Sequence, residues 1–168
     1  MLILAVLIFA PLLFEWRRAS ANERVQRARG GVEAPDDIYK MMRIAYPAGL
    51  LAMVVERGLR GASPPILLLA GATLFAAAKA LKWWAITTLG SAWTFRVIVV
   101  PGAPLVGGGP YRFVRHPNYI AVVAELVGAA LMTGAFISGP IATAIFGMLL
   151  RKRIGVEERM LGRAARPA

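Results

Sequence analysis

The 168-residue chain contains no cysteine and only one histidine. Without cysteine there are no disulfide bonds, no thiolate catalysis and no cysteine metal sites. A single histidine argues against a zinc site built from imidazoles, so we expect no bound metal. Charge is also scarce, at 17% of residues, and negative charge scarcer still. Nine acidic residues stand against 20 lysines and arginines, giving a net charge of +11.

Apolar residues, by contrast, make up 58% of the chain, and the mean hydropathy is +0.60. A soluble domain of this size has too little interior for so much apolar side chain, so the composition predicts a single membrane domain. The positive charge raises the question of nucleic-acid binding. However, the basic residues lie between apolar segments and not along one soluble face, which argues for membrane topology and against nucleic acid.

Five apolar segments predict an all-α integral membrane fold with about five transmembrane helices. They are residues 1–14, 44–55, 66–81, 120–137 and 141–150. The first is short against the ~20 residues that usually cross a bilayer. A signal peptide is the alternative for it, but no basic region precedes it and no small-residue cleavage site follows. We expect residues 1–81 to hold three spans and residues 82–168 to hold the functional core.

The polar segments between these spans carry their own signals. Asp36 and Asp37 are expected to cap the second helix. A separate interfacial helix is expected over residues 23–30, ending at the glycines that follow. Lys79 and Lys82 mark the expected exit of the third span.

Two further segments are expected to break the helical pattern. Residues 85–106 are expected to form an extended or re-entrant segment because of the β-branched run Val97–Val100. Ser138, Gly139 and Pro140 form the expected turn of a helical hairpin over residues 120–150.

The distribution of positive charge predicts the topology. Residues 17–43, 79–115 and 151–166 hold seven, five and six lysines and arginines, which is 18 of the 20. Five spans place all three groups on one side, and positive charge favours the cytoplasm. We therefore expect a multi-pass protein with the N-terminus outside and the C-terminus in the cytoplasm.

The stretch from Gly107 to Tyr119, GGGPYRFVRHPNY, is the predicted site. Its glycines and prolines disfavour a helix, and it lies between two apolar segments. Irregular backbone near a bilayer persists only where it is buried in protein or lines a polar cavity. The single histidine, His116, lies in this stretch, on the cytoplasmic side of the expected topology.

This stretch, GPYRFVRHPNY, followed by an apolar segment and then RIGVEERML, resembles the isoprenylcysteine carboxyl methyltransferase family. The upstream run LGSAWTFRVIVVPGAPLV also fits, so the resemblance covers residues 83–161. Members of that family are integral-membrane enzymes that use S-adenosyl-L-methionine. Phospholipid methyltransferases and sterol reductases share parts of the pattern.

The resemblance implies a set of site residues. The cofactor-binding positions are Ala103, Pro104, Leu105, Val106, Tyr111, His116, Pro117, Asn118, Tyr119 and Glu157. Arg153 is the implied catalytic and substrate-binding arginine, and Glu158 would support Glu157. A carboxylate suits the hydroxyl or amino groups of the cofactor, and an arginine can hold a substrate carboxylate with paired N–H donors.

Several of these residues also have structural explanations. His116 and Asn118 could cap the helix that follows, and the tyrosines could anchor the membrane interface. Arg153 and Glu157 are four apart, so they share one helix face and could form an ordinary ion pair. Glu125 lies within the fourth span, where an ionisable group is expensive. It would either shape the substrate pocket or pair with an arginine.

These observations predict an S-adenosylmethionine-dependent methyltransferase that acts on a lipophilic small-molecule or prenylated substrate in contact with membrane lipids. The predicted reaction is O-methylation of a carboxylate, either prenylcysteine-like or another lipid acid, or of a phenol. Transfer to an anion needs mainly alignment and water exclusion, so a nucleophilic side chain is not required. The alternatives are a membrane reductase of the sterol-reductase type, using a nicotinamide cofactor, and a non-enzymatic membrane scaffold.

Overall fold

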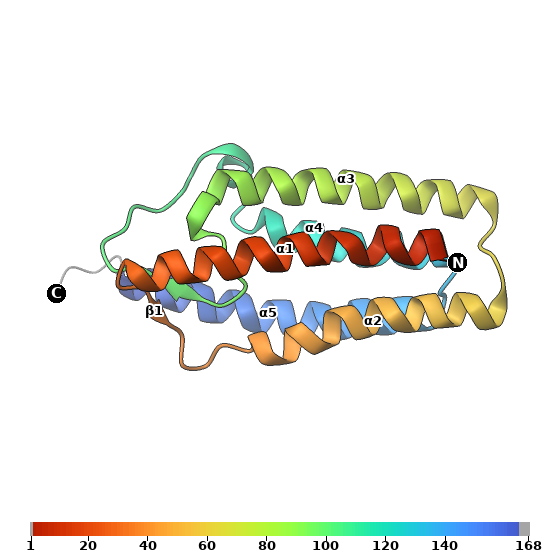
Figure 1. Ribbon diagram of the computed structural model, residues 1–168, viewed down its shortest axis with the longest axis horizontal. Helices are drawn as coiled ribbons and strands as arrows, with labels where there is room; N and C mark the ends of the chain where they lie inside the picture. Colours follow the sequence, from red (N-terminus) through yellow and green to blue (C-terminus); the bar gives the residue numbers. More distant parts are fainter. Residues whose placement is uncertain (1, 165–168) are drawn as a thin grey trace.

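The computed structural model describes residues 2–164 as a bundle of five long helices, which confirms the all-α fold (Figure 1). The helices are α1 (Leu2–Ala28), α2 (Tyr39–Arg60), α3 (Pro65–Leu89), α4 (Pro117–Thr133) and α5 (Ser138–Ala164). Successive helices run in opposite directions, so α1, α3 and α5 end at the same end of the bundle. The long loops 29–38 and 90–116 also lie at this end. We call it the site end, because the second loop contains most of the predicted site stretch. The end of the predicted basic tail, residues 165–168, lies outside the described residues.

Helix α1 shows that the prediction of a separate interfacial helix over residues 23–30 is wrong, while the length of the first span stays a prediction. The helix continues through Pro11 and Glu15 without a break. The Glu15 carboxylate does not mark an interface, because it lies 2.8 Å from the ammonium groups of both Lys79 and Lys82 inside the bundle. The helix ends, as the sequence predicted, at glycine: Gly30 has a φ of +79°.

Helices α2 and α3 are longer than their apolar segments. Asp37 accepts a hydrogen bond from the Tyr39 backbone N–H at 3.0 Å, as predicted, although the N-cap position of α2 is Ile38. The predicted capping by Asp36 is wrong, because Asp36 pairs with Arg159. Gly61, with a φ of +95°, ends α2, and α3 begins at Pro65. Helix α3 then extends to Leu89, well beyond the predicted exit at residue 81.

Helices α3 and α4 pack with their backbones in close contact. A Cβ at Gly71 would lie 2.6 Å from the Gly128 carbonyl oxygen, and one at Gly128 would lie 2.9 Å from the Phe75 backbone nitrogen. Glycines at both positions therefore let the helices approach, as the Ala- and Gly-rich third segment predicted. The main apolar core lies beside this contact and includes Ile8, Leu50, Met53, Leu126, Met132 and Phe146.

The helical hairpin of α4 and α5 is present, but its turn precedes the predicted residues 138–140. Gly134 adopts a left-handed conformation with a φ of +68° and ends α4, and α5 already begins at Ser138. The Glu56 carboxylate accepts a hydrogen bond from the Ser138 backbone N–H at 2.7 Å. This side chain thus stabilises the first turn of α5 from the neighbouring helix.

A two-stranded sheet joins the two long loops at the site end. Strand β1 (Val32–Glu33) pairs antiparallel with β2 (Ile98–Val99), with Val32 opposite Val99. The β-branched run is therefore extended, as predicted. Two short 3₁₀ helices, η1 (Gly90–Ala92) and η2 (Gly109–Arg112), complete the loop between α3 and α4.

Among the described residues, the helical stretch Pro65–Ala92 is the one that is both long and apolar enough to cross a membrane. Helix α4 is apolar but has only 17 residues. Large apolar side chains lie exposed along the outer faces of several helices, including Leu7, Leu51, Val55, Ile66, Leu69 and Ile145. Extensive exposed apolar surface is typical of membrane contact. The count of five spans stays a prediction.

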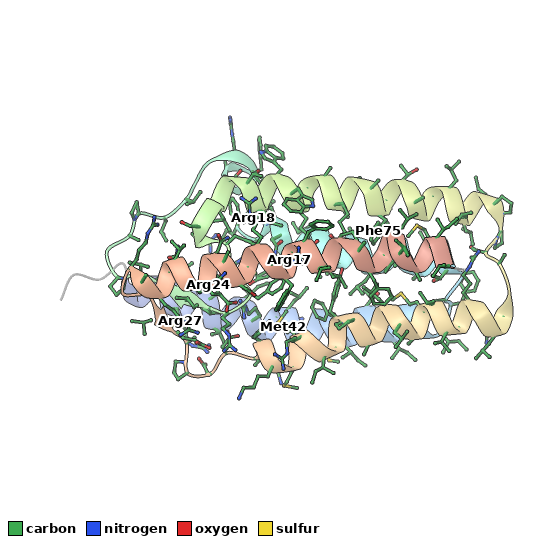
Figure 2. All side chains as sticks on the ribbon, viewed as in Figure 1. Arg17, Arg18, Arg24, Arg27, Met42 and Phe75 are labelled. Atoms are coloured by element: carbon green, nitrogen blue, oxygen red, sulfur yellow. The ribbon has the colours of Figure 1, made fainter. Side chains whose placement is uncertain are left out.

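Arginines gather at the site end. Figure 2 shows Arg17, Arg18, Arg24 and Arg27 along the part of α1 that leads to this end. The opposite end carries Arg57 and Arg60, at the end of α2. The loops that the sequence placed on one side therefore do lie together at one end of the bundle, while their orientation toward the cytoplasm stays a prediction.

Candidate active site

The predicted stretch Gly107–Tyr119 is irregular up to His116, as its glycines indicated, whereas Pro117, Asn118 and Tyr119 form the first turn of α4. Only η2 interrupts the loop before α4 begins at Pro117. Gly109 has a φ of +54°, and a Cβ there would lie 2.4 Å from the Thr88 hydroxyl oxygen on α3. Glycine at this position therefore lets the loop rest directly on the end of α3.

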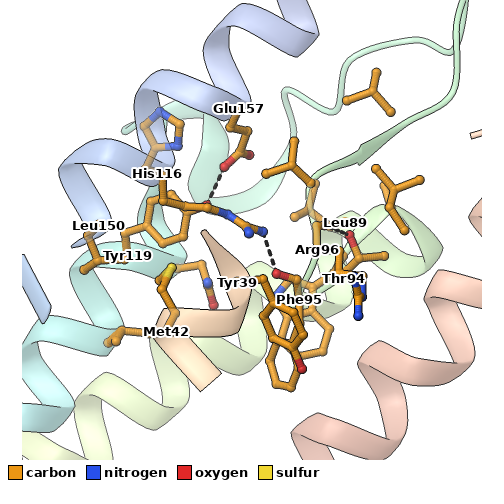
Figure 3. A pocket seen from close by; sticks show the side chains of 18 of the residues that line it. Tyr39, Met42, Leu89, Thr94, Phe95, Arg96, His116, Tyr119, Leu150 and Glu157 are labelled. Carbon is orange, nitrogen blue, oxygen red and sulfur yellow. Dashed lines mark hydrogen bonds between the residues drawn. The ribbon is translucent and has the colours of Figure 1, made fainter. Parts of the chain in front are cut away.

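Helix α5 brings its carboxylates to this loop. The Tyr119 hydroxyl donates to Glu157 Oε2 at 2.5 Å, and His116 Nε2 lies 3.4 Å from Glu158 Oε1. The His116 ring also stacks on the Tyr119 ring, with centroids 5.3 Å apart. Figure 3 shows His116, Tyr119 and Glu157 on one side of a pocket. Residues some 40 positions apart in the sequence thus form one cluster.

Arg153 has partners that the sequence did not predict. Its guanidinium donates to Asp37 Oδ1 at 2.5 Å and to the Phe95 carbonyl oxygen at 2.6 Å, and its Nε lies 3.4 Å from the Tyr119 hydroxyl. The structure contains no ion pair between Arg153 and Glu157 within the described residues. Arg153 therefore connects α5 to both long loops of the site end.

Asp37 is the residue of this site that the sequence reasoning missed. Besides capping α2 and binding Arg153, it accepts a hydrogen bond from the Val97 backbone N–H at 2.7 Å. Its carboxylate therefore has three donors from three parts of the chain. The only sequence signal was its place before a helix, which explains the first of these contacts and neither of the others.

The cluster opens into a cavity of about 870 Å³. Most of the sequence-predicted site residues line it, namely Ala103, Pro104, Leu105, Val106, Tyr111, His116, Asn118, Tyr119, Arg153 and Glu157. Two predicted residues do not: Pro117 is buried at the start of α4, and Glu125 lies deeper in the same helix. Figure 3 shows Tyr39, Phe95 and Arg96 on the wall opposite His116.

Two polar atoms on the His116 side of the cavity, the Asn118 side-chain oxygen and the Tyr111 hydroxyl, favour a polar ligand. The Asn118 side-chain oxygen is buried and has no hydrogen-bond partner among the described residues, so the predicted capping role for Asn118 is wrong. A buried acceptor without a donor is costly, and a ligand N–H or O–H would satisfy it. Burial and then the nearby Glu157 carboxylate raise the pKa of Tyr111, which keeps its hydroxyl neutral and able to donate.

Four charged side chains form a buried cluster next to this cavity, which we call the ion quartet: Glu15, Lys79, Lys82 and Glu125. The Lys79 ammonium lies 3.0 Å from Glu125 Oε1, and the Lys82 ammonium lies 3.0 Å from Glu125 Oε2. Tyr46 also donates to Glu125. The predicted exit at Lys79 and Lys82 is therefore wrong, because two carboxylates neutralise both lysines inside the bundle.

Glu125 thus pairs with lysines and not with an arginine. Its own side chain does not line the cavity, but those of its partners Lys82 and Tyr46 do. Lys82 and Glu15 line the cavity wall, whereas Glu125 is fully buried behind them. Two negative and two positive charges make the ion quartet neutral, which suits burial.

Comparison with known proteins supports the sequence interpretation. A family model described as the isoprenylcysteine carboxyl methyltransferase (ICMT) family matches residues 70–163, more than half of the chain. The chain is 28% identical over 160 residues to the uncharacterized protein YpbQ of Bacillus subtilis (strain 168), covering 95% of each chain. It is 25% identical over 138 residues to an uncharacterized protein of Haemophilus influenzae, covering 82% of this chain and 80% of the relative.

No solved structure matches the chain. The family match covers the loop with His116, the hairpin and the helix that carries Arg153 and Glu157. The chain therefore belongs to the isoprenylcysteine carboxyl methyltransferase family of membrane methyltransferases.

Proposed function

We propose that this protein is an S-adenosylmethionine-dependent methyltransferase that O-methylates a lipophilic acceptor, a lipid carboxylate or phenol. The observation that carries the proposal is the convergence of His116, Asn118, Tyr119 and Glu157 on one cavity that continues into the apolar bundle. A cofactor with polar groups suits the first part of this cavity, and a lipid suits the second.

The residues of the loop and α5 fit S-adenosyl-L-methionine. The unpartnered Asn118 oxygen would accept a hydrogen bond from the cofactor, and Glu157, held in place by Tyr119, would accept from its hydroxyl or amino groups. The rings of Tyr111 and Tyr119 attract a sulfonium. Residues Ala103–Val106 cover the cofactor with backbone and apolar contacts. The cofactor supplies an activated methyl group on its sulfur.

The protein contributes alignment and exclusion of water, which suffice for methyl transfer to an anion. Arg153 orients the acceptor oxygen, and its own orientation is fixed by Asp37 and the Phe95 carbonyl. The acceptor enters from the bilayer between helices. A multi-pass topology with the N-terminus outside places the site and the C-terminus in the cytoplasm, where the cofactor is available.

Calorimetric titration of the detergent-purified protein tests the proposal. We expect saturable binding of S-adenosylmethionine that is lost or strongly weakened in Glu157→Gln and His116→Ala. The matched control is Asp36→Asn, which removes a negative charge at the same end of the bundle but outside the cavity, where Asp36 pairs with the exposed Arg159.

NADPH serves as the parallel ligand in the same titration. Unchanged affinity for S-adenosylmethionine in both cavity variants would contradict the site assignment. Binding of NADPH alone would favour a reductase, and a folded sample that binds neither would favour a scaffold.

A further inference from the structure

The cavity has two walls of different origin. Residues of the loops and α5 within the family-matched range form the cofactor wall proposed above. The other wall comes from α1 and α2, outside that range, and includes Leu12, Glu15, Trp16, Met42, Arg43 and Tyr46. We call this the acceptor wall, since a lipid between α1 and α2 would lie against it.

Most of the cations that line the cavity already have carboxylate partners. Arg153 binds Asp37, Arg96 binds Glu33, and Lys82 binds two carboxylates of the ion quartet. Within residues 2–164, two lining cations form no ion pair and no side-chain hydrogen bond: Arg43 and Arg115. Arg115 lies in the loop next to His116, on the cofactor wall. Arg43 lies in the first turns of α2, on the acceptor wall.

Arg153 can orient an acceptor oxygen while it stays paired with Asp37, but Asp37 already compensates its charge, so Arg153 does not select an anionic acceptor. Asp37 has three donors, including two backbone N–H groups, so a substrate carboxylate would have to displace it from a well-satisfied position. Displacement would leave the buried Asp37 carboxylate without its guanidinium partner, which is strongly unfavourable. The exposed guanidinium of Arg43 has no such competitor.

We infer that Arg43 binds the anionic head group of the acceptor and thereby selects a negatively charged lipid. This rests on the proposed function and adds to it the charge of the acceptor and the residue that recognises it. The same cavity is lined by the apolar side chains of Met42, Val122, Phe146 and Leu150, which suit a hydrocarbon chain. Glu15 and Lys82 of the neutral ion quartet also line the cavity, where the quartet adds no net charge.

The test measures equilibrium binding of radiolabelled palmitate and of radiolabelled hexadecanol to the full chain in one detergent. The two probes share a hydrocarbon chain and differ in charge. A charge-assisted hydrogen bond predicts that Arg43→Ala weakens palmitate binding about tenfold and leaves hexadecanol binding unchanged. Arg43→Lys is expected to restore part of the affinity for palmitate.

Lys40→Ala is the matched control. Lys40 lies one turn earlier on α2, carries the same charge and is exposed, but it does not line the cavity. Equal losses of palmitate binding in Lys40→Ala and Arg43→Ala would show general attraction to surface charge and would overturn the inference. A loss in Arg115→Ala with Arg43→Ala unchanged would also overturn it, because the head group would then lie at the loop.

Two further measurements keep the result unambiguous. Phosphatidylcholine, whose head group has no net charge, is added as a competitor: displacement of palmitate at equal concentration would show that the site does not select by charge and would overturn the inference. S-adenosylmethionine titration of the same samples shows that each variant is folded. If that ligand binds normally but palmitate binding does not depend on Arg43, the inference fails while the proposed function stands.

Discussion

The ion quartet makes a quantitative prediction about stability. Glu125 and Lys82 are 0% and 3% exposed, so neither charge is screened by water. Glu125→Gln leaves two lysines facing one carboxylate, and Lys82→Met leaves two carboxylates facing one lysine. An uncompensated buried charge costs about 3–5 kcal/mol, which at roughly 2–4 °C per kcal/mol lowers Tm by about 6–20 °C for a chain of this size.

The double variant Glu125→Gln/Lys82→Met gives the sharper result. It removes one charge of each sign and leaves the pair of Glu15 and Lys79, 2.8 Å apart, intact. We therefore expect the double variant to lose less stability than either single variant, which corresponds to a coupling energy larger than a single loss, above about 3 kcal/mol. Thermal unfolding followed by intrinsic fluorescence in one detergent measures all three. The reasoning is refuted if the double variant loses the sum of the single losses within about 0.5 kcal/mol.

Three further predictions concern the loops and the helix contact. Gly109→Ala should weaken S-adenosylmethionine binding, since its Cβ meets the end of α3, whereas Gly107→Ala, with open space around it, should not. Gly71→Leu should lower Tm strongly, because α3 could no longer approach α4. Burial alone would raise the pKa of Glu33, but the hydrogen bonds and charges of Arg27 and Arg96 outweigh this effect. The pKa of Glu33 in the folded protein is therefore lowered from its usual value of 4.5. The ionised Glu33 side chain should therefore stabilise the protein fully at pH values above the unfolded-state pKa, and this stabilisation should be lost as the pH falls through the lower folded-state pKa. The Tm values of the wild type and of Glu33→Gln should converge in acid.

Local sequence signals predicted the helices but not all of their limits. Hydropathy found each apolar segment, and Gly30, Gly61 and the Asp37 cap marked true boundaries. The errors arose where charged residues were assumed to lie at an interface. Glu15 and Lys82 continue their helices because they neutralise each other across the bundle, and their separation of 67 residues in the chain hides this from any local pattern.

The candidate site could be located from the sequence, but its connections could not. The loop before α4 and the helix with Glu157 were found by resemblance, and the structure brings them within hydrogen-bond distance. The partner of Arg153, in contrast, lies 116 residues away in a loop that carries no comparable motif. The unpartnered Asn118 oxygen also depends on the fold, since the sequence alone suggested an ordinary helix cap.

On the proposed five-span topology, the ion quartet also constrains the order in which the chain can enter a membrane. Glu15 on α1 is synthesised 64 residues before Lys79 and 110 residues before Glu125, with which it shares both lysines. A lone carboxylate in the centre of a bilayer costs about 2.5–3.5 kcal/mol. The Glu15 charge on α1 is therefore neutralised only once α3 supplies Lys79 and Lys82. The second lysine charge on α3 is neutralised only once α4 supplies Glu125. Assembly of the first helix thus waits for the fourth, so a ribosome-bound chain stopped before residue 125 should leave α1 accessible from the aqueous phase.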